Sequence, residues 1–126
     1  VINRSFFRLF MDQKKYKKAI PYLEKIVKKE NVFNRFLGYS YIKTGDTLKA
    51  YSIIDSIRKN GHPREKSYQL AVVYGGLKMN DSVIFHLDTL RNKHSRTLKR
   101  EHSEFFNYLK DNKEYQAILK SHGIND

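Results

Sequence analysis

The sequence of 126 residues contains no cysteine, only two prolines and only six glycines. Without cysteine the chain has neither a disulfide framework nor a cysteine-built metal site, and it is compatible with both reducing and oxidising compartments. No apolar stretch approaches the ~20 residues that a membrane-spanning helix needs. The localisation therefore stays open. Because the chain begins at Val1 rather than with methionine, we expect it to be a fragment of a longer protein.

Positive charge is the most prominent feature of the composition. Lysine and arginine number 25 against 13 acidic residues, which gives a formal net charge of +12. The chain is nevertheless 40% hydrophobic and 13% aromatic, which is enough to bury a core. The length and composition thus favour one folded domain over a disordered chain.

Apolar residues recur every three or four positions, and the chain has no run of alternating β-branched residues, so we predict an all-α fold. The predicted helical segments cover residues 16–27, 32–41, 50–57, 70–77 and 83–90. Side chains suited to N-caps lie between these segments at Asp12-Gln13, Thr44-Gly45-Asp46 and Asn80-Asp81. A proline inside a helix removes one backbone hydrogen bond, so we predict a kink at Pro21.

An internal repeat underlies this periodicity. Similar residues recur 33 positions apart in five pairs, namely Gly38 and Ala71, Tyr41 and Tyr74, Ala50 and Val83, Ile54 and Leu87, and Ile57 and Leu90. An interval of 31 positions relates Ala19, Leu23 and Ile26 to Ala50, Ile54 and Ile57 in the same way. A more degenerate copy is therefore predicted within residues 1–30.

Leu37-Gly38, Tyr41, Gly45-Asp46, Ala50, Ile54 and Ile57 resemble the tetratricopeptide repeat, a helix–turn–helix unit of ~34 residues. The resemblance covers roughly residues 1–93. It implies a right-handed α-solenoid of about three hairpins at 1–30, 31–63 and 64–95, closed by capping helices at 96–126. The aromatic-led segment 104–122 also resembles the tail of tetratricopeptide regions at the C-terminus of larger bacterial regulatory and signalling proteins. This second resemblance implies that the chain is the C-terminal module of something longer.

The sequence contains no constellation typical of catalysis. It has no HExxH zinc signature and no glycine-rich phosphate loop, so we predict neither an enzyme nor a bound cofactor or metal. The five histidines are scattered, and we expect them to be solvated. Asp111 and Glu114 have the spacing of an N-cap and its reciprocal acid, so we expect them to cap the last helix.

In tetratricopeptide arrays the first helix of each hairpin lines a concave groove that usually binds a peptide. The resemblance assigns to this groove Arg4, Arg8, Arg35, Tyr39, Lys43, Glu65, Tyr68, Gln69 and Val72. Arginine, lysine and tyrosine side chains would suit a peptide with carboxylates and an aromatic or aliphatic anchor. The chain is therefore interpreted as a non-catalytic scaffold that binds a peptide or a neighbouring domain. The alternative is that these residues are merely solvated helix faces.

Lysines crowd the second predicted helix and its flanks: Lys14, Lys15, Lys17, Lys18, Lys25, Lys28 and Lys29. Such a face could bind nucleic-acid phosphates or an anionic surface, and this is the alternative function. Because sequence-specific readers of nucleic acid rely heavily on arginine, the protein-binding interpretation is preferred. A second basic cluster, comprising Arg91, Lys93, Arg96, Lys99 and Arg100, is predicted to be a solvated connection. The oligomeric state stays open.

Overall fold

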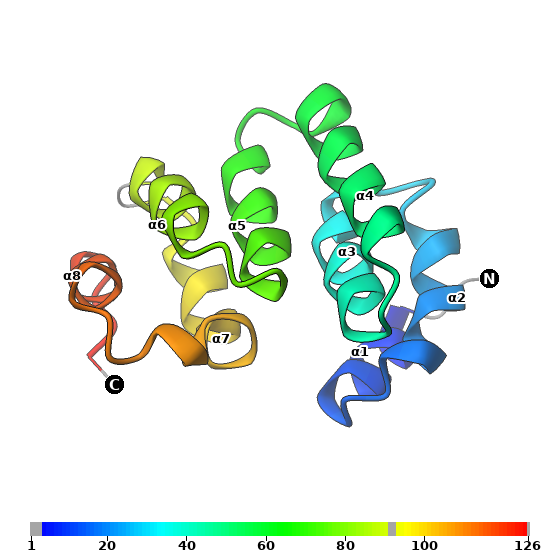
Figure 1. Ribbon diagram of the computed structural model, residues 1–126, viewed down its shortest axis with the longest axis horizontal. Helices are drawn as coiled ribbons and strands as arrows, with labels where there is room; N and C mark the ends of the chain where they lie inside the picture. Colours follow the sequence, from blue (N-terminus) through cyan, green and yellow to red (C-terminus); the bar gives the residue numbers. More distant parts are fainter. Residues whose placement is uncertain (1–3, 91–92, 126) are drawn as a thin grey trace.

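The computed structural model describes residues 4–90 and 93–125, with side chains from Phe6 onward. Helices are the only regular secondary structure in these residues (Figure 1). The α-helices are α1 (Arg4–Asp12), α2 (Tyr16–Ile26), α3 (Asn34–Lys43), α4 (Thr47–Asn60), α5 (Lys66–Gly76), α6 (Asn80–Thr89), α7 (Ser95–Phe105) and α8 (Lys113–Ser121). Two short 3-10 helices, η1 (Asn31–Phe33) and η2 (Asn107–Leu109), precede α3 and follow α7. The predicted all-α class is confirmed, and each predicted segment overlaps one of the helices α2 to α6.

From α1 to α6, consecutive helices pack against one another along the chain. α1 contacts α2, α2 contacts α3, and α3 contacts both α4 and α5. α5 in turn contacts α6 and α7, and α6 contacts α8. The helix pair α1–α2 lies at one end of the molecule and α8 at the other (Figure 1). No helix in the described part of the chain combines the length and the apolar character needed to cross a membrane.

The turns between α1 and α2, α3 and α4, and α5 and α6 have the same geometry. Each contains a residue in the left-handed region, at Lys14, Gly45 and Lys78, with φ of 58°, 88° and 57°. The N–H of that residue donates to the carbonyl three positions back, and the next N–H donates to the carbonyl five positions back. These are the bonds of a Schellman motif. The left-handed residues lie 31 and 33 positions apart, so the interval found in the sequence recurs in the backbone.

This turn geometry decides where the helix caps fall. The residue after the left-handed position becomes the N-cap, and only Asp46 has a suitable side chain there, which accepts a hydrogen bond from the Lys49 N–H at 3.3 Å. The predicted caps at Asp12-Gln13 and Asn80-Asp81 are wrong, because Lys15 and Met79 occupy the N-cap positions. The predicted cap at Asp111 is also wrong.

Instead, the side chain of Asn112 caps α8 by accepting a hydrogen bond from the Tyr115 N–H at 2.9 Å.

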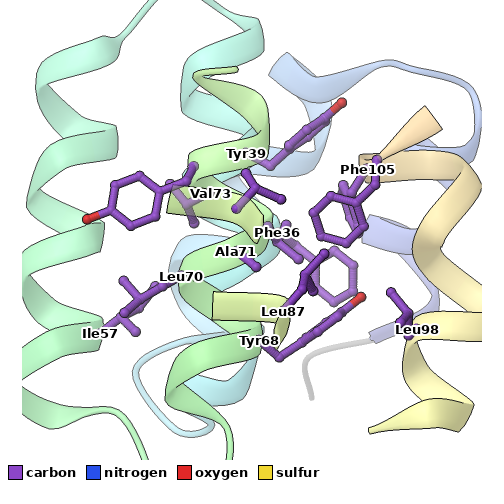
Figure 2. Packing of buried hydrophobic residues seen from close by; sticks show 14 of the residues in the cluster. Phe36, Tyr39, Ile57, Tyr68, Leu70, Ala71, Val73, Leu87, Leu98 and Phe105 are labelled. Carbon is purple, nitrogen blue, oxygen red and sulfur yellow. The ribbon is translucent and has the colours of Figure 1, made fainter. Parts of the chain in front are cut away.

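Small residues lie where the helices approach most closely. A Cβ atom on Gly38 would lie 2.8 Å from Cγ2 of Val73 on α5 and 3.1 Å from Cγ2 of Ile53 on α4. Ala19, Ala50 and Ala71 are each 0% exposed. Since a larger side chain would separate the backbones, these residues set the spacing of the helices. Figure 2 shows the core that results around Ala71 and its neighbours.

Helix α7 is the main departure from the sequence prediction. The basic cluster of Lys93, Arg96, Lys99 and Arg100 was predicted to be a solvated connection, and these side chains are exposed. The segment is nevertheless a helix, Ser95–Phe105, in the region where capping helices were expected at 96–126, and Arg91 lies outside the described residues. Leu98, Glu101 and Phe105 of α7 are 0%, 4% and 2% exposed. Figure 2 shows Leu98 and Phe105 pointing toward the side chains of α3 and α5. Helix α7 is therefore part of the core.

Candidate interaction surface

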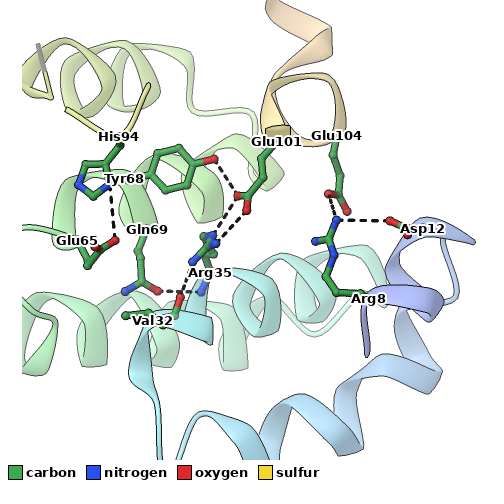
Figure 3. Close-up of polar contacts among 10 residues, drawn as sticks. All are labelled: Arg8, Asp12, Val32, Arg35, Glu65, Tyr68, Gln69, His94, Glu101 and Glu104. Carbon is green, nitrogen blue, oxygen red and sulfur yellow. Dashed lines mark hydrogen bonds and ion pairs between the residues drawn. The ribbon is translucent and has the colours of Figure 1, made fainter. Parts of the chain in front are cut away.

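The groove residues predicted on α3 and α5 come together around a carboxylate supplied by α7 (Figure 3). Nε and Nη2 of Arg35 donate to Oε1 and Oε2 of Glu101 at 3.0 and 2.9 Å, and the Tyr68 hydroxyl donates to Oε1 at 2.8 Å. The third nitrogen of Arg35, Nη1, donates to the Val32 carbonyl at 2.6 Å. The Gln69 side-chain oxygen accepts from the Arg35 backbone N–H at 3.1 Å. Glu101 thus links α3, α5 and α7.

Burial makes this cluster part of the protein interior. The side chains of Arg35 and Glu101 are 11% and 6% exposed, and Tyr68 and Gln69 are fully buried. Burial and the negative charge of Glu101 raise the pKa of Tyr68 well above its usual value, against the opposing effect of Arg35. The Tyr68 hydroxyl therefore stays protonated and keeps donating to the carboxylate.

A second acid of α7 reaches the residue that was predicted to line the groove on α1. Nη2 of Arg8 lies 3.5 Å from Oε1 of Glu104 and 3.4 Å from Oδ1 of Asp12. Burial raises the pKa of Glu104, and this effect outweighs the attraction of Arg8. The other nitrogen, Nη1 of Arg8, is buried and has no hydrogen-bond partner within the described structure. Arg8 therefore keeps an unused donor.

The remaining predicted groove residues divide between the core and the surface. Tyr39 is 6% exposed and packs edge-on against Phe105 of α7, with ring centroids 4.7 Å apart. Nζ of the exposed Lys43 lies 5.3 Å from the centre of the Tyr39 ring. Val72 is buried. Arg4 is the first residue of α1, and its side chain lies outside the described part of the chain.

Beside α7 the face stays open as a pocket of about 470 Å³ between α1, α3 and α7. Its lining combines three guanidinium groups, three aromatic rings and one carboxylate, contributed by Phe7, Arg8, Phe33, Arg35, Phe36, Arg100 and Glu101. Cζ of Arg35 lies 4.3 Å from the centre of the Phe36 ring, and Cζ of Arg8 lies 5.1 Å from it. The pocket therefore offers cations stacked on apolar rings, a combination suited to a carboxylate with an attached apolar group.

Sequence reasoning missed Arg100 and the aromatic wall of this pocket. Arg100 was assigned to a solvated connection, because the segment that carries it is the least repeat-like part of the sequence. A buried helix face is indicated by the helical spacing of Leu98, Glu101 and Phe105. The pattern was overlooked because Glu101, in its middle, is polar. Arg100 is exposed and makes no ion pair with any described residue.

The lysines of the alternative site all lie exposed on α2 and its flanks. None of the seven forms an ion pair with a carboxylate among the described residues. The acid that faces them in the sequence, Glu24, accepts a hydrogen bond from the Tyr41 hydroxyl at 2.5 Å. The lysine face on α2 is therefore available to solvent.

Within the described ranges, no group of three histidine or acidic side chains could hold a metal ion. The prediction that all histidines are solvated is wrong for His94, whose side chain is 13% exposed and lies 3.8 Å from the Glu65 carboxylate. It is also wrong for His122, which is partly buried with Nδ1 2.7 Å from the Ser95 hydroxyl.

Comparisons with family models, with curated proteins and with solved structures found no match to this chain.

Proposed function

We propose that the chain is a non-catalytic protein-interaction module of the tetratricopeptide type, acting within a longer protein. In this proposal the three helix pairs from α1 to α6 form a right-handed solenoid, and α7 and α8 close it. The recurring turn at Lys14, Gly45 and Lys78 supports the repeat, as does the burial of small residues at the same interval.

The proposal rests above all on the way in which the face of α1, α3 and α5 already holds α7. Arg35 and Arg8 pair with Glu101 and Glu104, and Phe105 packs on this face next to them. The surface thus accepts a helix that combines carboxylates with an aromatic ring. The open pocket beside this face adds the exposed guanidinium of Arg100. The partner is therefore proposed to be a peptide or domain that places a carboxylate next to an aromatic or aliphatic side chain.

A charge-reversal pair on α7 tests this proposal. Arg100 lines the pocket, whereas its exposed neighbour Lys99 does not, and substitution of either by glutamate changes the net charge equally. Fluorescence anisotropy with a labelled peptide rich in glutamate and phenylalanine should show binding that Arg100→Glu weakens about tenfold or more. Lys99→Glu should have a much smaller effect. Equal weakening by both variants would remove the pocket from the proposal.

A second candidate function is favoured by the exposure of the lysines on α2. Such a face could neutralise the phosphates of nucleic acid, and binding would then weaken steeply as the salt concentration rises. A salt titration with random duplex DNA tests it, using Lys25→Glu and Lys28→Glu as variants. Failure to bind the duplex at low salt would dismiss this candidate.

A further inference from the structure

A second hollow lies between α6 and α8. These two helices lie at the end of the molecule opposite to α1 and α2 (Figure 1). It has a volume of about 590 Å³, which falls within the ~300–1,000 Å³ usual for ligand pockets. Its lining combines acidic with apolar side chains, including Asp81, Ile84, Phe85, Asp88, Glu114 and Ile118. We call this hollow the α6–α8 groove.

The carboxylates of the α6–α8 groove have no cationic partner among the described residues of a strongly cationic chain. Asp81, Asp88 and Glu114 form no ion pair with any described cation, although the net charge is +12. Asp81 and Glu114 lie in the first turns of α6 and α8, where the helix dipole favours an acid. Asp88 lies in the last turn of α6, where the dipole disfavours it. The helix dipole therefore does not explain why residue 88 is acidic.

An exposed aromatic ring stands beside these acids. Phe85 is 64% exposed, and its ring lies edge-on to His86 with centroids 5.1 Å apart. Ile84 is partly buried and Ile118 is 7% exposed, so the base of the groove is apolar. An apolar centre with a polar rim is the usual anatomy of a protein–protein contact, and a large ring at its centre is a typical hot spot.

We propose that the α6–α8 groove docks a cationic amphipathic helix of a partner protein. Apolar side chains of that helix would cover Phe85 and Ile84, while its lysine or arginine side chains would pair with the three carboxylates. The charge of the groove, opposite to that of the chain as a whole, selects a basic occupant. This inference is independent of the proposed function, because it concerns the opposite end of the molecule and the opposite charge.

A second copy of the chain fits this groove less well. The lysine-rich stretch formed by α2 and its flanks is its most basic segment, but the apolar residues Ala19, Leu23 and Ile26 of that helix are buried in their own core. It would therefore offer cations without an apolar anchor for Phe85.

The absence of tryptophan allows a direct measurement. In the full chain, Phe85→Trp introduces a single tryptophan at the groove. The probe is a synthetic amphipathic helix with leucines on one face and lysines on the other, and its control is the same helix with glutamates in place of the lysines. The lysine peptide should shift the tryptophan emission to the blue in a saturable way, because the ring becomes covered. The glutamate peptide should leave the emission unchanged.

Labelled lysine peptide and anisotropy then identify the contacts. Phe85→Ala should weaken binding about tenfold or more, and Asp88→Asn about three- to tenfold. The matched controls are Leu48→Ala and Asp55→Asn on α4, where Leu48 is 83% exposed and the Asp55 side chain 61% exposed. These controls should bind like the unaltered chain.

Three outcomes would overturn the proposal. The first is an absence of saturable binding, and the second is binding that falls equally in the groove and control variants. The third is self-association in sedimentation experiments that Phe85→Ala abolishes, because this would assign the groove to a second copy.

Discussion

The face covered by α7 and the α6–α8 groove contain similar side chains in different environments. Acids and aromatic rings are buried on the covered face and exposed in the groove. On the covered face Glu101 is 4% exposed and bound by Arg35, and Phe105 is 2% exposed. In the groove Asp88 has no cationic partner among the described residues, and Phe85 is 64% exposed. The difference lies in coverage, since a helix of the same chain covers one surface and leaves the other open.

This comparison separates side chains that stabilise the fold from those that remain free to bind. A buried carboxylate must be paired, because its desolvation costs several kcal/mol unless a cation and hydrogen bonds compensate. An exposed carboxylate has no such requirement, so its removal leaves the fold intact. We expect substitutions on the two surfaces to divide accordingly between effects on stability and effects on binding.

The largest contrast is expected between two phenylalanines. Phe105→Ala should lower the free energy of unfolding by about 3–5 kcal/mol, because it leaves a cavity against Tyr39 and Phe36. Phe85→Ala should change it by less than about 0.5 kcal/mol, since the ring is mostly in water. Urea denaturation of both variants gives the comparison. Similar losses in the two would show that α7 is not an integral part of the core.

Loss of the buried carboxylate should come next. Glu101→Gln leaves the guanidinium of Arg35 without a countercharge and should cost about 3 kcal/mol or more. The double variant with Arg35→Gln should cost less than the sum of the two single variants, because it leaves no unpaired charge. Thermal unfolding of the four proteins provides the cycle. Additive losses would contradict a direct coupling of α3 to α7.

A pH dependence should follow from Glu104. Its pKa in the folded protein is raised above the ordinary 4.5 by burial. The protonated carboxyl therefore makes its full favourable contribution to the free energy of unfolding below about pH 4.5. This contribution is lost as the pH rises through the raised pKa. Glu104→Gln stays neutral, so its stability relative to the unaltered chain should increase from pH 4 toward pH 7. A difference that stays constant with pH would show that Glu104 titrates normally.

The smallest change in the free energy of unfolding is expected in the α6–α8 groove, where the substitution should stabilise the protein. Asp88→Asn should raise the free energy of unfolding by about 0.3–1 kcal/mol, because it removes a carboxylate from the unfavourable end of the α6 dipole. Chemical denaturation at low ionic strength would measure the gain, which added salt should reduce. A loss of stability would mean that Asp88 supports the fold.

The positions of α2 to α6 could be predicted because apolar side chains recur there at helical spacing, although α3 and α5 are buried on nearly every side rather than on one face. Ala50 and Val83 illustrate this, since the residues paired by the repeat are both 0% exposed. Caps were less predictable. The N-cap follows from the left-handed turn before it, and at Lys14 and Lys78 that turn forms without the glycine that would have marked it.

The candidate site lies in the interior rather than in the open groove that the sequence predicted. The Arg35 N–H donates to Gln69 and the Tyr68 hydroxyl donates to Glu101 of α7, and both Tyr68 and Gln69 are fully buried. The sequence places Glu101 at least 32 positions away from these three residues, in a segment rich in charged side chains. Only the folded chain brings Glu101 to Arg35.

By itself, then, the sequence determined the helical class, the repeat interval and the small residues at helix crossings, because these depend on local spacing and side-chain volume. The tertiary structure alone decided which charges are paired, which aromatic rings are covered and where hollows remain. Those properties depend on contacts between residues distant in the chain. The environment of a carboxylate such as Glu101 or Asp88 is decided only when a helix packs over it or leaves it exposed.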